Sequence, residues 1–148
     1  MTAKIATLTL ADLEEGQSAE FEAEISQDDI DRFASVSGDI SPLHMSTDFA
    51  CSRGFHRRVV HGALLGGLVS RLVGVYLPGR DCLLHSMQMK FLAPTYAGTR
   101  VRVTGTVDQL SEAANAMVVK VSIIDTQTEV VLATSTVRIG FTKEKRDV

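Results

Sequence analysis

The most apolar part of this sequence lies in GALLGGLVSRLVGVYLPG, residues 62–79. Apolar side chains occur nearly all round a helix drawn through residues 62–77, and such a helix has to be surrounded by other structure. Pro78 and Gly79 end the helix, because proline lacks a backbone N–H and glycine accepts the conformation that closes helices. Arg71 interrupts the apolar run, which is shorter than the roughly 20 residues that span a bilayer. The stretch therefore predicts one long buried helix and no membrane span.

The chain after this helix is rich in strand signals. Four segments of apolar and β-branched residues are separated by short, turn-rich pieces such as residues 94–98. Consecutive strands with short connections favour an antiparallel sheet. A sheet of about five strands that curls around one helix is an α+β architecture. The predicted strands are residues 82–92, 100–108, 116–125 and 130–141.

The chain before the helix predicts a further strand and a capped helix. Apolar residues alternate with glutamates over residues 19–26, which is the period of a half-buried strand. Ser26, followed by Asp29 three residues later, forms a start like a capping box, and Gly38 is suited to end the helix that follows. One face of that helix is marked by Ile30, Phe33, Ala34 and Val36 or Ser37.

Composition and charge describe an ordinary globular protein. The chain has 148 residues, 45% of them hydrophobic and 22% charged, which predicts a single domain over residues 1–148. A net charge of -3 with both signs interspersed lacks the concentrated basic face that nucleic acids require, so no nucleic-acid partner is expected. The first residues do not resemble a secretory signal. Cys51 and Cys82 are then expected to be reduced thiols in a cytoplasmic protein.

An irregular segment, residues 39–61, separates the two predicted helices. Its apolar periodicity is lost, apart from a short helix expected between Thr47 and Gly54. Long irregular segments inside compact domains are uncommon and are often functional. This one begins within the sequence SGDISPLH, residues 37–44, and it ends at His61, directly before the buried helix.

Asp39 and His44 supply the groups that acid/base chemistry on a carbonyl compound needs. A carboxylate and an imidazole can share a water and move protons in both directions. Pro42 stiffens the loop between them. The N–H groups at the start of the helix after His61 are free to donate to a developing oxyanion. A turn aspartate and a surface histidine explain the same pattern, so spacing alone leaves both interpretations open.

The run FASVSGDISPLHMSTDFACSRGFHRRVVHGALLGGLVSRLVGVYLPG, residues 33–79, resembles the MaoC-like family of (R)-specific enoyl-CoA hydratases and dehydratases, which have the hot-dog fold. Its two elements, SGDxxPLH and VVHG, precede an apolar helix at the family's separation. The resemblance implies a hydro-lyase that hydrates trans-2-enoyl thioesters to (R)-3-hydroxyacyl thioesters, or catalyses the reverse dehydration. The substrate is then an acyl-CoA or an acyl-carrier-protein thioester.

Carried over by position, the resemblance makes Asp39 and His44 the catalytic pair, with the N–H of Gly62 donating to the thioester carbonyl. Ser70 matches a serine that helps to hold the active-site groups, although a helix-interior serine can also bond to a carbonyl one turn earlier. Ser41 departs from the pattern, because many members have an asparagine there, and a serine offers one donor in place of two.

A basic cluster in the irregular segment suggests how an anionic carrier could bind. Arg57 and Arg58, together with Arg53 and His56, could contact the phosphates of coenzyme A or an acidic carrier protein. A solvated charged surface is the simpler alternative. The histidines and cysteines show no metal-ligand spacing, and no glycine-rich phosphate loop is present, so neither a metal nor a cofactor is expected.

Two other functions are compatible with the same fold. One is an acyl thioesterase in which the loop carboxylate directs water at the carbonyl carbon, and the other is a non-catalytic module that binds acyl thioesters. A serine nucleophile is not expected, because the GxSxG elbow is absent. A hot-dog subunit leaves a sheet edge and part of its helix uncovered, which predicts a two-fold homodimer.

Overall fold

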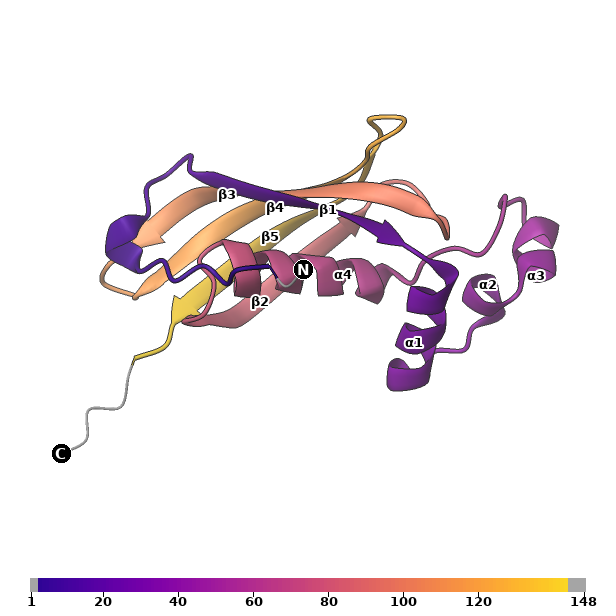
Figure 1. The fold of residues 1–148 in the computed structure, drawn as a ribbon, viewed down its shortest axis with the longest axis horizontal. Coiled ribbons are helices and arrows are strands. Elements are labelled where there is room, and N and C mark those ends of the chain that lie inside the picture. The colour runs from indigo at the N-terminus through magenta and orange to yellow at the C-terminus, as the bar shows by residue number, and fades with distance from the viewer. Residues whose placement is uncertain (1–2, 144–148) are drawn as a thin grey trace.

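Five strands form one antiparallel sheet in the computed structural model, which describes residues 3–143 (Figure 1). The spatial order of the strands is β1-β3-β4-β5-β2, so β1 and β2 lie at the two edges. All neighbouring pairs are antiparallel, and short connections predict this for the β3–β4 and β4–β5 pairs. The strands are β1 (Ser18–Ile25), β2 (Cys82–Phe91), β3 (Thr99–Ser111), β4 (Ala116–Asp125) and β5 (Val131–Phe141).

The helix predicted from residues 62–79 lies against one face of this sheet (Figure 1). It runs as α4 (Gly62–Arg71) and continues as one π-helical turn, η2 (Leu72–Tyr76). Leu72 is fully buried, and a Cβ atom on Gly105 of β3 would lie 2.4 Å from its Cδ2 atom. Glycine at this position therefore lets the helix approach the sheet closely. The predicted α+β hot-dog architecture, an antiparallel sheet packed against one long helix, is confirmed.

The prediction that other structure surrounds this helix on all sides is wrong for the single chain. Leu65 and Val69 are buried against the sheet, whereas Ala63, Gly67 and Ser70 on the other side of α4 are exposed. The reason is that the sheet covers only one side of the helix. The three helices that lie between β1 and α4 in the chain gather beyond its amino end and do not lie along it (Figure 1).

Helix α1 (Gln27–Ser37) begins and ends as the sequence predicts. The Ser26 hydroxyl accepts a hydrogen bond from the Asp29 N–H at 3.1 Å, and the Asp29 carboxylate accepts one from the Ser26 N–H at 2.8 Å, which completes a capping box. Gly38 ends the helix with a φ of 77°. The expected burial of Val36 is wrong, since it is 83% exposed, because the part of the chain described here places no element over that side of α1.

The irregular segment contains two short helices, α2 (Pro42–Met45) and α3 (Thr47–Ser52). The sequence predicts α3 but not α2, whose four residues are too few to show a helical period. A short 3-10 helix, Leu10–Asp12, precedes β1. Among residues 3–143, no helix combines the length and the apolar character that crossing a membrane requires.

Candidate active site

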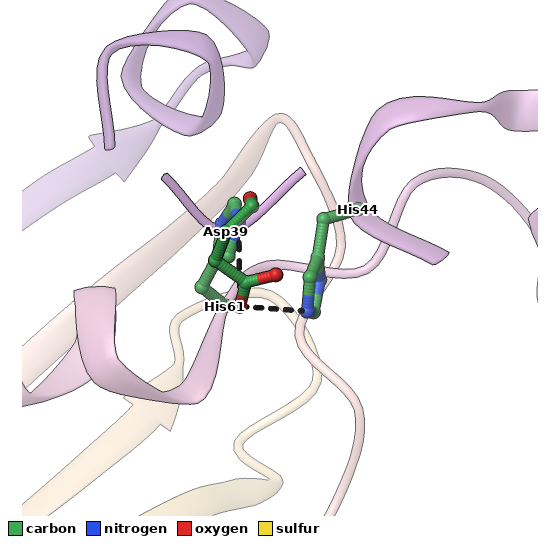
Figure 2. A group of neighbouring side chains, drawn as sticks. All are labelled: Asp39, His44 and His61. Carbon is green, nitrogen blue, oxygen red and sulfur yellow. Dashed lines mark hydrogen bonds and ion pairs between the residues drawn. The ribbon is translucent and has the colours of Figure 1, made fainter. Parts of the chain in front are cut away.

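Three side chains from separate elements meet near the amino end of α4 (Figure 2). Asp39 follows α1, His44 lies on α2, and His61 is the residue directly before α4. The Oδ2 atom of Asp39 is 4.0 Å from Nε2 of His44 and 4.0 Å from Nε2 of His61. The fold therefore brings the two residues singled out by the sequence into proximity, and it adds a third.

The carboxylate of Asp39 is oriented by its own loop. One oxygen, Oδ1, accepts a hydrogen bond from the Ser41 N–H at 3.1 Å, and the Asp39 N–H donates to the Ser37 hydroxyl at 3.1 Å. The other oxygen, Oδ2, is left to face the two imidazole rings (Figure 2). The side chain of Asp39 is 49% exposed, so solvent water can reach the carboxylate.

The His44 ring is held in one tautomer by a backbone contact. Its Nδ1 atom lies 2.7 Å from the carbonyl oxygen of Val59, which can only accept, so Nδ1 carries a proton. In the neutral ring, Nε2 then has a free lone pair, and this atom faces Asp39. The pair therefore presents a carboxylate oxygen and a basic nitrogen to the same small space.

His61 lies behind this pair. It is only 1% exposed, and its Nε2 donates to the backbone oxygen of Asp39 at 2.9 Å. Its ring stacks on His44, with 3.9 Å between centroids, and contacts the Phe33 ring at 4.8 Å. Within residues 3–143 its buried Nδ1 has no hydrogen-bond partner. No role in the site is predicted for His61 from the sequence, and its position directly before Gly62 is the signal that could have pointed to it.

Asp39, His44 and His61 are residue types that bind metals, but the hydrogen bond made by His61 is not compatible with a three-ligand metal site. Their ligand atoms lie within 4.8 Å of one another. However, Nε2 of His61 uses its proton in the bond to the Asp39 carbonyl, so it has no lone pair directed at the group. Two ligands, Asp39 and His44, remain in this arrangement, whereas catalytic zinc sites use three protein ligands.

Gly62 and His44 line a cavity of about 480 Å³. Gly62 opens α4, and its N–H makes no hydrogen bond within the described part of the chain. The walls include the apolar side chains of Leu65 and Phe91. A Cβ atom at position 62 would lie 2.8 Å from Cζ of Phe91, so a larger residue here would require the Phe91 ring to move. The cavity thus combines an apolar wall, a free N–H donor and the His44 ring.

Ser41, Ser70 and Arg57, the other predicted substrate-binding residues, lie in three different parts of the structure. Ser41 belongs to the Asp39 loop, and its carbonyl accepts from the His44 N–H at 2.9 Å. Ser70 lies on the exposed side of α4, and within residues 3–143 its hydroxyl makes no hydrogen bond. The guanidinium of Arg57 lies 5.6 Å from the Tyr96 ring centroid, on the surface.

Arg58 does not lie on the surface with Arg57. It is only 8% exposed, and its guanidinium pairs with Asp31 and also donates to the carbonyl of His44. The prediction that Arg58 meets substrate phosphates is therefore wrong, because its N–H groups are already used inside the protein.

This chain is similar to a known protein family in both sequence and structure. The model of the MaoC-like domain matches residues 10–138. The (R)-specific enoyl-CoA hydratase of Rhodospirillum rubrum is 39% identical over 99 residues, covering 67% of this chain and 69% of that protein. The 3-hydroxybutyryl-CoA dehydratase of Methylorubrum extorquens is 36% identical over 110 residues, covering 74% of this chain and 70% of that protein. The solved (R)-hydratase of Aeromonas caviae has a TM-score of 0.83 at 29% identity, covering 87% of this chain and 97% of that one.

Proposed function

This chain belongs to the MaoC-like family, as its residues 33–79 predict, and we propose that it is a hydro-lyase acting on acyl thioesters. It adds water to trans-2-enoyl thioesters to form (R)-3-hydroxyacyl thioesters, or removes water in the reverse direction. The relatives named for hydration and for dehydration support both directions. The observation that carries the proposal is the 4.0 Å separation of Asp39 Oδ2 and His44 Nε2 beside the Gly62 N–H and its cavity.

The proposed mechanism uses Asp39 and His44 as one unit. A water between Oδ2 and Nε2 can donate a proton to either atom while its oxygen attacks C3 of the enoyl group. The pair then returns a proton to C2, so that the elements of one water are added in total. Coupled groups of this kind share their protons, and the proton belongs to the pair rather than to one residue.

The free N–H of Gly62 is the proposed donor to the thioester carbonyl. Negative charge develops on this oxygen when water attacks C3, and the amino end of α4 favours it. One oxyanion donor contributes on the order of 3 kcal/mol to a transition state of this type. The apolar wall of Leu65 and Phe91 suits the acyl chain that extends from the carbonyl.

We propose that Arg57 binds the carrier part of the substrate. Its guanidinium lies over Tyr96, and Tyr96 follows Thr95, which lines the cavity. A cation at this rim is well placed for the phosphates of coenzyme A or of the acyl carrier protein's prosthetic group. Ser41 and Ser70 stay predictions as substrate-binding residues.

The decisive experiment is a panel of enoyl-CoA and 3-hydroxyacyl-CoA substrates assayed in both directions. We expect crotonyl-CoA to lose its enoyl absorbance without release of free thiol. Thiol release with the enoyl absorbance intact would identify a thioesterase, and saturable binding without turnover would identify a binding module. Either of these results contradicts the proposed function.

We further propose a two-fold homodimer in the cytoplasm. Strand β2 is a sheet edge whose Leu83, Met87 and Phe91 are exposed, and the exposed side of α4 also lacks a cover within the described residues. Both cysteines are free thiols, which suits a reducing compartment.

Light scattering after size-exclusion chromatography is expected to give about twice the chain mass of 16.0 kDa. Leu83→Glu should shift the protein to a monomer, because it places a charge on the apolar edge of β2. Val130→Glu is the control, since Val130 is also an exposed apolar residue but lies in the loop directly before β5. A wild-type protein that elutes as a monomer contradicts the dimer.

A further inference from the structure

Arg58 is the one arginine of the basic cluster that is buried, and its guanidinium has partners on both α1 and α2. Its Nε donates to the carbonyl of His44, and its Nη2 donates to the carboxylate of Asp31. Its Nη1 lies 3.5 Å from the side-chain oxygen of Gln27. A buried guanidinium is stable only with partners of this kind, so its position depends on them.

The same short segment also holds the His44 ring. The Val59 N–H donates to the Leu43 carbonyl at 3.2 Å, and the Val59 carbonyl accepts from Nδ1 of His44 at 2.7 Å. With the Arg58 contact to the His44 carbonyl, residues 58–59 bind α2 at three points around His44. The direction of the His44 ring therefore depends on where residues 58–59 lie.

Asp31, the other partner of Arg58, belongs to the helix that leads to Asp39. It lies on α1, and α1 ends at Ser37, two residues before Asp39. Arg58 consequently bridges α1, which positions Asp39, and α2, which carries His44. The separation of the two proposed catalytic groups is set by elements that this guanidinium joins.

We propose that Arg58 is a positioning residue for the acid/base pair and holds His44 at its working distance from Asp39. This inference rests on the proposed function and assigns Arg58 no contact with substrate. Arginine suits the role, because its planar fork donates in two directions at once, to Asp31 and to His44, whereas a lysine ammonium on its flexible stem does not reproduce this fork.

The test compares Arg58→Met with Arg32→Met. Arg32 is a matched control, because it also pairs with an aspartate of α1, Asp28, at 2.8 Å, but on the surface. A displacement of about 1 Å can cost on the order of a hundredfold in rate, so we expect Arg58→Met to lower kcat by tenfold or more with KM within about threefold. Arg32→Met should leave both constants unchanged. Arg58→Lys should recover only part of the loss.

Asp31→Ala removes the other partner of the same ion pair, and Asp28→Ala is its control. This variant tests the proposal if Arg58→Met fails to fold. A readout independent of turnover is the ¹⁵N NMR spectrum of His44. Loss of the bridge should change the signal of the protonated Nδ1, whereas a purely stabilising contact should leave it unchanged.

Wild-type kcat in both Arg58→Met and Asp31→Ala, or an unchanged His44 spectrum in them, overturns the positioning role. A wild-type protein without hydratase activity overturns the proposed function instead, and the His44 spectrum then still decides whether Arg58 positions the ring.

Discussion

Replacing Asp39 by asparagine is expected to lower kcat for hydration of crotonyl-CoA by about a hundred- to ten-thousand-fold, the usual contribution of a positioned acid/base group. The amide oxygen can keep the contact that Oδ1 receives from the Ser41 N–H. The amide nitrogen, however, replaces Oδ2 and faces Nε2 of His44 with a donor, so it accepts no proton from water. The variant should thus keep the conformation of the loop but lose the group that exchanges a proton with water.

Initial rates at saturating substrate, together with a thermal melt, measure the two effects separately. The side chain of Asp39 is half exposed, so the free energy of unfolding should change by less than about 1 kcal/mol. Asp28→Asn is the control, because it neutralises an exposed aspartate of α1 away from the site. Near-normal turnover in Asp39→Asn would end the assignment of this carboxylate.

Replacing His44 by glutamine is expected to have an effect of similar size. Glutamine can donate to the Val59 carbonyl in place of Nδ1, but it has no group that takes up and returns a proton near neutral pH. It also loses the stacking on His61, so a modest loss of stability should accompany the loss of rate. Rates measured in both directions should fall by the same factor, since a catalyst does not move the equilibrium between enoyl and hydroxyacyl thioesters.

The double variant of Asp39 and His44 tests whether the two residues share one water. Groups that act as a unit are strongly non-additive, so the double variant should be little slower than the slower single variant. Rate losses that multiply would show instead that the residues act in separate steps, and a single His44→Gln variant with near-normal turnover would remove His44 from the mechanism.

Much of the fold could be predicted because its signals are local. The alternation of β1, the capping box at Ser26 and the stop at Pro78 each depend on residues within a few positions of one another. The motif holding Asp39 and His44 was likewise readable, since the two residues lie in one short loop. Helix α2 could not be predicted, because its four residues carry no periodic signal.

The five strands, the central helix, the family and the candidate acid/base pair could be predicted from the sequence, because each depends on a pattern of neighbouring residues. Three features became visible only in the folded chain: Arg58 is internal, His61 stacks on His44, and one side of α4 is exposed. Burial and hydrogen-bond partners depend on residues distant in the chain, such as Asp31 for Arg58. No local pattern encodes such contacts, so the same basic residue type gives a surface side chain at position 57 and an internal one at position 58.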